Sequence, residues 1–178
     1  MINVLFFASS PINTQLIRFD RESRQIRNSL SKSHLNLHLR IDAHLEDLVP
    51  SITEIEPTIV HFSCHGSPNG MYLTSENGTA KLINPLVLGN IIKRICPKVK
   101  IIVLNTCFSQ SYADAIASAI DNVVFFPSSL GDEEAIIFSR EFYRALAINK
   151  SVRDAYDIAV DTLKSHGCKV VHQIIIRN

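Results

Sequence analysis

Two side chains that could carry out nucleophilic chemistry come directly after apolar, β-rich segments of the sequence. His65 follows the segment 58–64, and Cys107 follows the segment 101–106. A thiol attacks a carbonyl carbon as the thiolate, and an imidazole within reach can remove the thiol proton. The sequence therefore predicts a reactive pair in which His65 is the general base and Cys107 is the nucleophile.

The segments that must position this pair alternate between short strand patterns and longer helical patterns. This alternation predicts one α/β domain over residues 1–178, with a mostly parallel central sheet of about six strands and helices on both faces. Loops that follow parallel strands line a crevice at the carboxyl edge of such a sheet. One helix joins the two reactive segments, so a right-handed crossover can place their strands side by side, about 4.8 Å apart.

The boundaries of these elements follow from apolar periodicity and from helix start and stop signals. The expected strands are 4–8, 35–41, 58–64, 99–105, 123–126 and 169–175, with a hairpin at 71–78. The expected helices are 16–30, 44–55, 85–95, a short helix capped by Ser111 and Asp114, 132–148 and 152–165.

Acyl transfer through a thiolate also needs donors for the oxyanion that forms on the substrate. Gly66 follows His65, and a residue without a Cβ lets its N–H approach a substrate carbonyl closely. The backbone N–H of Cys107 is the second donor. We expect Gly66 and Cys107 to form the oxyanion hole.

The motifs around the pair resemble those of CHAT peptidases in the caspase and separase clan. His65-Gly66 is similar to their His-Gly element, and the segment 105–109 is similar to their Asn-Ala-Cys element, with Thr106 in place of the alanine. The resemblance extends over most of the chain, including 59–63, 131–146 and 151–155. It implies a three-layer caspase-like fold and a cysteine-type endopeptidase without cofactor. It also implies a polypeptide substrate and a regulatory or sensor protein, in bacterial antiviral defence or cell death.

Two further residues are expected near the substrate. Asn105 lies two residues before Cys107, and in similar families this position lines the pocket for the residue preceding the scissile bond. Its neutral amide carries no charge for a guanidinium, which predicts a neutral or apolar substrate residue there rather than Arg or Lys. Asp132 has two interpretations, as a helix cap and as a residue of the substrate pocket.

Other functions remain open at this stage. A catalytically silent caspase-fold interaction module would keep the fold and use the cleft to dock a partner. A redox-sensing protein would use Cys64 and Cys107, if their sulfur atoms lie close enough for a disulfide. A zinc site is not expected, because His61 and His65 would lie about 13 Å apart along an extended strand.

Composition and charge limit the other classes of function that the chain could have. The formal net charge is +1, and apolar residues make up 46% of the chain. Arginines at 18, 21, 24 and 27 are interrupted by Asp20 and Glu22, which favours a solvated helix face over a nucleic-acid stripe. We expect no direct nucleic-acid partner, no membrane association and no disulfide framework, and therefore a cytoplasmic location.

Overall fold

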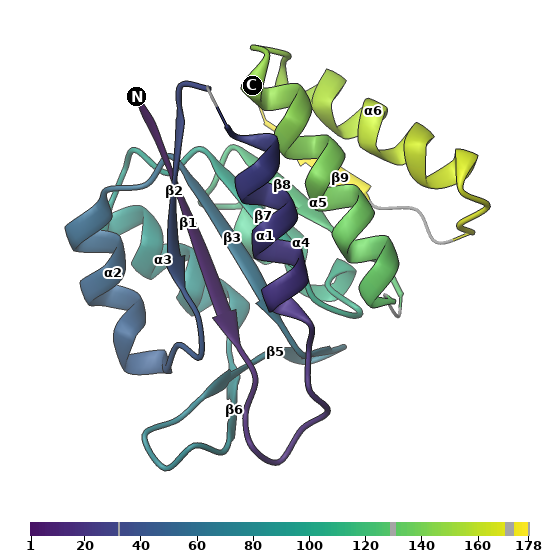
Figure 1. Cartoon of the computed structure of the whole chain (residues 1–178). Helices are drawn as coiled ribbons and strands as arrows, with labels where there is room; N and C mark the ends of the chain where they lie inside the picture. The colour runs from purple at the N-terminus through teal and green to yellow at the C-terminus, as the bar shows by residue number, and fades with distance from the viewer. Residues whose placement is uncertain (32, 129–130, 170–172, 178) are drawn as a thin grey trace.

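The central sheet has six strands in the order β2-β1-β3-β7-β8-β9 in the computed structural model, which describes residues 1–178 except 32, 129–130, 170–172 and 178 (Figure 1). Neighbouring strands from β2 through β8 pair in parallel, and β9 runs antiparallel to β8. The strands are β1 (Ile2–Ser9), β2 (Leu35–Arg40), β3 (Ile59–Cys64), β7 (Ile101–Asn105), β8 (Asn122–Phe125) and β9 (Gln173–Ile176). The predicted last strand, 169–175, overlaps β9, and its residues 170–172 lie outside the described part of the chain.

Helices cover both faces of this sheet, as Figure 1 shows. One apolar core lies between the sheet and α2, α3 and α4, and a second lies between the sheet and α1, α5 and α6. The predicted three-layer α/β fold is therefore confirmed. The helices are α1 (Phe19–Ser29), α2 (Leu48–Ile55), α3 (Pro85–Ile95), α4 (Gln110–Ala117), α5 (Asp132–Ala147) and α6 (Val152–Ser165), with a 3₁₀ turn, η1 (Leu45–Asp47), before α2.

Local sequence explains where most of these helices begin. The Asn84 side chain accepts hydrogen bonds from the backbone N–H groups of Leu86 and Val87, and Pro85 occupies the first turn of α3. Ser151 caps α6 by accepting from the Asp154 N–H at 3.0 Å. The mostly apolar sequence of β3 allows both of its faces to be covered, and all six of its residues are buried.

Two predicted helix starts are wrong. The helix α4 begins at Gln110 with Ser109 as its N-cap residue, so Ser111 lies inside the helix and is not its cap. The helix α1 begins at Phe19, and Leu16 is 70% exposed in the loop before it. That loop must cross the carboxyl edge of the sheet, which a continuous helix from residue 16 would prevent.

A small second sheet stands at this carboxyl edge. Its antiparallel strands are β4 (Gly66–Ser67), β5 (Gly70–Thr74) and β6 (Ala80–Ile83). The loop between β1 and α1 is tied to it, since Ile12 N donates to Gly78 O at 3.0 Å and Ala80 N donates to Asn13 Oδ1 at 2.9 Å. Figure 1 shows the loop and the small sheet at the same end of the molecule. The hairpin predicted at 71–78 is confirmed by the pairing of β5 with β6.

Candidate active site

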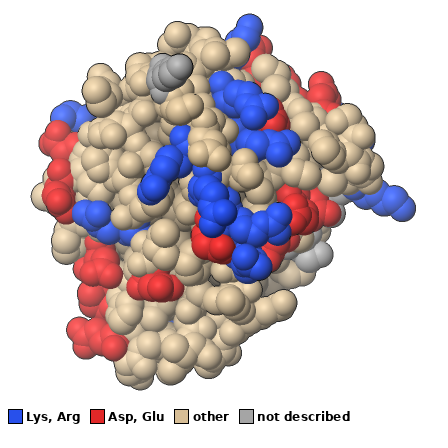
Figure 2. Space-filling view, in the orientation of Figure 1, with Lys and Arg blue, Asp and Glu red and all other residues tan. Residues whose placement is uncertain are grey.

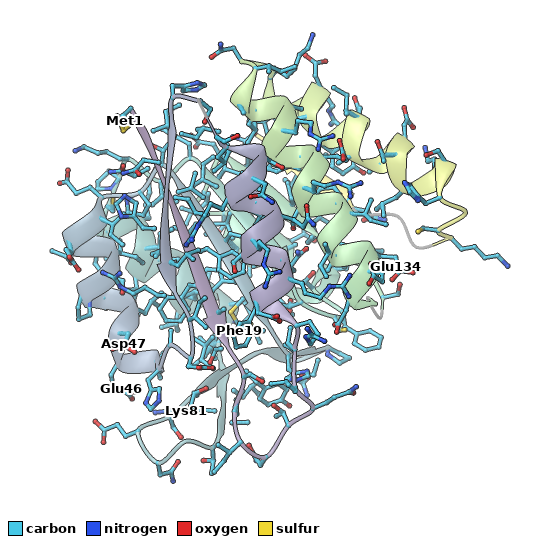
Figure 3. All side chains as sticks on the ribbon, in the orientation of Figure 1. Met1, Phe19, Glu46, Asp47, Lys81 and Glu134 are labelled. Carbon is cyan, nitrogen blue, oxygen red and sulfur yellow. The ribbon has the colours of Figure 1, made fainter. Side chains whose placement is uncertain are left out.

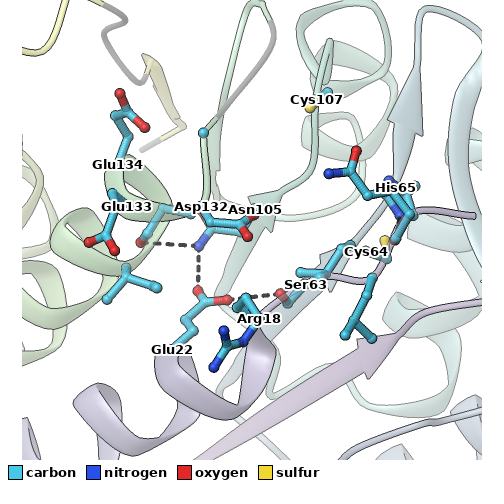
Figure 4. A pocket seen from close by; sticks show the side chains of 16 residues that line it. Arg18, Glu22, Ser63, Cys64, His65, Asn105, Cys107, Asp132, Glu133 and Glu134 are labelled. Atoms are coloured by element: carbon cyan, nitrogen blue, oxygen red, sulfur yellow. Dashed lines mark hydrogen bonds between the residues drawn. The ribbon is translucent and has the colours of Figure 1, made fainter.

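His65 and Cys107 follow neighbouring strands and line one cavity. β3 and β7 pair in parallel with Ser63 opposite Asn105, so the residues after each strand end at the same edge. The cavity has a volume of about 630 Å³, and Figure 4 shows side chains that line it. Its lining residues are Gln15, Leu16, Ile17, Arg18, Glu22, Ser63, Cys64, His65, Asn105, Cys107, Gly131, Asp132, Glu133, Glu134, Ala135 and Ile136.

The loop before α1 fixes the imidazole of His65. Its Nε2 lies 2.5 Å from the backbone carbonyl oxygen of Gln15. A carbonyl oxygen can only accept, so Nε2 carries a hydrogen in this contact. When the imidazole is neutral, this contact therefore selects the tautomer in which Nδ1 is the proton acceptor.

The loop that carries Cys107 is held to the end of β8. Phe108 N donates to Ser128 O at 3.0 Å, and Ser109 N donates to Phe126 O at 2.8 Å. The buried Ser109 hydroxyl also accepts from Phe126 N at 2.7 Å. Phe108 has a φ of 55°, in the left-handed region that a bulky residue occupies only where its surroundings enforce it. The turn after Cys107 is therefore set by several contacts at once.

Gly66 packs directly against this loop. A Cβ at position 66 would lie 2.3 Å from the carbonyl oxygen of Cys107 and 2.9 Å from the hydroxyl oxygen of Tyr112. Real Cβ atoms do not approach other atoms so closely, so the space admits glycine alone. The sequence predicts that Gly66 lets a substrate carbonyl approach, and the structure adds a close approach of Gly66 to the backbone of Cys107.

Asn105 belongs to a buried polar cluster behind the reactive pair. Its Nδ2 donates to Glu22 Oε1 and, at 2.8 Å, to Ser139 Oγ. The Ser63 hydroxyl donates to Glu22 Oε2 at 2.8 Å, and the Ser139 hydroxyl donates to Glu22 Oε1 at 2.7 Å. The carboxylate of Glu22, on α1, thus joins β3, β7 and α5 beneath the cavity.

The Glu22 carboxylate keeps its charge despite its burial. Burial by itself raises the pKa of this carboxyl, but the nearby His61 and the hydroxyls of Ser139 and Ser63 outweigh it, so the pKa is lowered from its ordinary value. His61 Nε2 lies 3.0 Å from Glu22 Oε1, an ion-pair distance at which the ring N–H is not aligned for a hydrogen bond. His61 contacts the carboxylate from within the core and does not line the cavity.

Asp132 lies at the rim of the cavity and is not a helix cap. The N-cap residue of α5 is Gly131, and Asp132 is the first residue of the helix. Asp132 and Arg18 both line the cavity, and the pKa of Arg18 is raised from its ordinary value mainly by its hydrogen bond and charge contact with Asp20, with a smaller contribution from Asp132. Asp132 therefore lies among the cavity-lining residues, and its role in a substrate pocket stays a prediction.

The other cysteines lie apart from this chemistry or are shielded from it. Cys64 is 2% exposed and packs in the core between the sheet and α2, α3 and α4. Burial, and then the nearby Cys107, raise the pKa of the Cys64 thiol, so it stays protonated at neutral pH. Cys96 is also buried, and Cys168 lies near α6. No cluster of three or more metal-binding side chains occurs among the described residues.

Basic side chains on the surface over α1 and α5 alternate with acidic ones, as Figure 2 shows. Arg21 pairs with Glu133 at 2.7 Å, and Glu141 pairs with both Arg140 and Arg144. The face of α1 is thus a solvated, ion-paired surface, except that Glu22 turns inward. In the described part of the chain, no helix combines the length and apolar character needed to cross a membrane.

Sequence reasoning missed two functional groups of this site. Gln15 contributes a backbone carbonyl, which leaves no signal in residue type. Glu22 was grouped with the exposed face of the first helix, yet it lies three residues after Phe19 and four before Ile26, both buried. That spacing is the signal that could have found it.

Comparisons with known proteins agree with this fold. The chain is 28% identical over 174 residues to a "Roc-COR-CHAT protease" from an unknown prokaryotic organism, covering 90% of this chain and 16% of that protein. It is 22% identical over 150 residues to a "Probable protease" of Gillisia limnaea, covering 80% of this chain and 26% of that protein. No family model matches the chain. The chain thus spans about a sixth to a quarter of the curated relatives it matches.

Two solved structures share its architecture. A secreted C11 cysteine protease from Bacteroides thetaiotaomicron, in complex with an irreversible peptide inhibitor, superposes with a TM-score of 0.63 at 12% identity, covering 92% of this chain and 59% of that one. The Drosophila initiator caspase Dronc superposes with a TM-score of 0.64 at 7% identity, covering 98% and 79%. The fold is caspase-like, and the chain is similar in sequence to CHAT-type proteases, as predicted.

Proposed function

We propose that this domain is a cysteine endopeptidase in which His65 activates Cys107. The observation that carries the proposal is the single cavity of about 630 Å³ that both residues line, at the ends of two neighbouring strands. The contact of His65 Nε2 with Gln15 O supports it, since it leaves Nδ1 as a proton acceptor. The names of the two protease relatives support it independently.

The reaction then proceeds by two acyl transfers. His65 Nδ1 takes the thiol proton, and the Cys107 sulfur forms a bond to the substrate carbonyl carbon as the carbonyl electron pair moves to oxygen. The N–H groups of Gly66 and Cys107 stabilise this oxyanion. When the electron pair on the oxyanion re-forms the carbonyl, the C–N bond breaks and the leaving amine takes the proton from His65. A thioester to Cys107 remains. Water, deprotonated by His65, attacks the thioester and releases the acid and the thiol.

The proposed substrate is a polypeptide, and the proposed control is a regulatory or sensor protein. Both curated relatives are several times longer than the matched region, which supports control by further domains or partners. We place the activity in bacterial antiviral defence or cell death, on the resemblance to CHAT peptidases.

The test is covalent labelling of the intact chain with peptidyl acyloxymethyl ketones, read by intact and peptide mass spectrometry. We expect adducts on Cys107 that are lost in Cys107→Ala and strongly slowed in His65→Ala, with the fold checked by circular dichroism. Cys64→Ser should keep the labelling. Absence of any adduct on Cys107, with iodoacetamide still reacting there, would leave a silent interaction module as the better account.

A further inference from the structure

We propose that Tyr112 is a positioning residue for the two backbone donors of the proposed oxyanion hole. Its buried hydroxyl holds the backbone of Cys107 and borders Gly66, the residues whose N–H groups would stabilise the oxyanion. This inference rests on the proposed peptidase function. It goes beyond that function because it assigns the aim of both donors to a side chain outside the cavity lining.

The place of Tyr112 in the fold brings its hydroxyl to the nucleophile from behind. Tyr112 lies in the first turn of α4, and its side chain is 2% exposed. It packs in the core between the sheet and α2, α3 and α4, a layer that Figure 3 shows filled with side chains. The ring gains from this burial, but a buried hydroxyl needs hydrogen-bond partners. Those partners come from the segment that carries Cys107.

A short chain of hydrogen bonds runs through this hydroxyl. Tyr112 donates to the Cys107 carbonyl oxygen at 3.4 Å and also contacts the hydroxyl of Thr106. A phenol has one hydrogen, and a carbonyl oxygen can only accept. Because Tyr112 gives its hydrogen to Cys107, the Thr106 hydroxyl must donate to the Tyr112 oxygen. Burial raises the pKa of Tyr112 from its ordinary value, so the hydroxyl stays protonated and remains a donor near neutral pH.

This chain restrains the backbone on both sides of Cys107. The N–H of Cys107 belongs to the planar peptide group that joins residues 106 and 107, and its carbonyl belongs to the next peptide group. Tyr112 contacts the second group at the carbonyl oxygen and restrains the residue before the first group through the Thr106 hydroxyl. The far side of the loop is held at Phe108 N and Ser109 N. Tyr112 therefore completes the contacts that decide where the Cys107 N–H points.

The second donor residue borders the same hydroxyl. A Cβ on Gly66 would lie 2.9 Å from the Tyr112 hydroxyl oxygen and 3.1 Å from the Cβ of Thr106. Gly66 thus lies against both members of the hydrogen-bond chain. An oxyanion hole works only when its donors are held at fixed positions. Loss of the Tyr112 hydroxyl would remove the partner of Thr106 and of the Cys107 carbonyl, and both donors could then shift.

The test compares two reactions of Cys107, of which only one forms an oxyanion. With a peptidyl aldehyde, the sulfur bonds to the carbonyl carbon, the carbonyl electron pair moves to oxygen, and this oxygen takes the proton that His65 removed from the thiol. With iodoacetamide, the sulfur displaces iodide from a CH₂ carbon and no oxyanion forms. Aldehydes ending in Arg, Leu or Asp are compared on the intact chain. The aldehyde that best protects wild-type Cys107 from iodoacetamide is then used, and mass spectrometry gives its dissociation constant and the alkylation rate.

Tyr112→Phe keeps the buried ring and removes the hydroxyl. We expect it to raise the dissociation constant of the aldehyde at least about 10-fold, less than the roughly 100-fold or more lost when an oxyanion donor is removed altogether. The alkylation rate without aldehyde should stay close to that of wild type, because the contact between His65 and Gln15 is unchanged. General destabilisation would not separate the two reactions. Tyr156→Phe, on α6 and outside the cavity lining, is the matched control and should leave both values unchanged.

Thr106 supplies a second test, which also serves if circular dichroism shows that Tyr112→Phe does not fold. Thr106→Val keeps the shape of the side chain and removes the hydroxyl, whereas Thr106→Ser keeps the hydroxyl. We expect Thr106→Val to weaken aldehyde binding as Tyr112→Phe does, and Thr106→Ser to retain it. The double variant Tyr112→Phe/Thr106→Val should be no weaker than either single variant, because the two hydroxyls act in one chain.

The outcomes separate this inference from the proposed function. Unchanged aldehyde binding in folded Tyr112→Phe or in Thr106→Val would overturn the role of Tyr112 and leave the peptidase proposal standing. An equal loss of the iodoacetamide reaction would also overturn it, because the hydroxyl would then act on the thiol and not on the oxyanion site. Failure of all the aldehydes to protect wild-type Cys107, with iodoacetamide still reacting there, would instead count against the proposed function.

Discussion

Replacing Gly66 with alanine should disable the active site while preserving the fold. The new Cβ would lie 2.3 Å from the Cys107 carbonyl oxygen, whereas ordinary van der Waals contact begins at 3.4 Å. One of the two backbones must therefore move by about 1.1 Å. Tyr112, whose hydroxyl would be 2.9 Å away, and β4, which pairs with β5, limit how far Gly66 can retreat.

The displacement acts on Cys107, the nucleophile of the proposed function. A misplacement of about 1 Å at a reacting group can cost about 100-fold in rate. We therefore expect kcat/KM, or the labelling rate of Cys107, to fall about 100-fold. The free energy of unfolding should fall by only about 1–3 kcal/mol, the usual effect of an inserted methyl group.

The assay is the rate of ketone labelling beside urea unfolding of the same preparation. The matched control is Gly89→Ala, in α3, where the nearest atom to the new Cβ would be the Ile116 Cα at 3.3 Å. That variant tests glycine replacement in a packed place away from the cavity, and it should keep the wild-type labelling rate. A Gly66→Ala enzyme with wild-type labelling would refute the reasoning, because the loop of Cys107 would then tolerate the shift.

Three further predictions follow from the same structure. Cys107 should be alkylated by iodoacetamide before Cys168 at neutral pH, because both thiols are half-buried but Cys107 shares its cavity with His65. Peptide mass spectrometry that finds Cys168 labelled first would contradict activation of the Cys107 thiol by His65. Ser109→Ala should lower the free energy of unfolding by about 1–3 kcal/mol, because the buried Phe126 N–H loses its Ser109 acceptor, whereas the exposed Ser118→Ala should change it by less than about 0.5 kcal/mol. The lowered pKa of Glu22 means that folded protein keeps this carboxylate charged to lower pH than unfolded chain does. Its stabilisation is present above the unfolded pKa, about 4.3, and is lost as pH falls through the folded pKa. The stability difference between wild type and Glu22→Gln should therefore shrink below about pH 4 in urea titrations, and a widening difference would show the opposite sign.

The central sheet, and the edge at which the candidate site lies, were predictable because they depend on residue type and order. Apolar runs such as 59–64 and 101–105 can be buried on both faces, and that burial makes them central strands. Once these strands are neighbours, the positions of His65, Cys107 and Asn105 follow from where each strand ends.

The parts that escaped prediction depend on contacts between distant segments. Leu16 matches the helical period of Phe19, yet the loop must stay open there so that the Gln15 carbonyl can reach His65. The position of Glu22 in the helical repeat predicts a buried residue, whereas its charged side chain is of a type that is usually exposed. Its burial is possible because other elements bring partners to the charge: His61 lies at ion-pair distance, and Ser63, Asn105 and Ser139 donate hydrogen bonds to it.

The contact between His65 and the Gln15 carbonyl also bears on how this loop can diverge. Every residue has a backbone carbonyl, so the orientation of the base is independent of which side chain occupies position 15. Substitutions there can accumulate without loss of the proton acceptor, provided that the path of the loop is kept. The exposed side chains of Gln15 and Leu16, which belong to residues lining the cavity, can therefore vary without changing this contact. On the proposed function, the orientation of the His65 base depends on the path of this loop, whereas its exposed side chains can change independently.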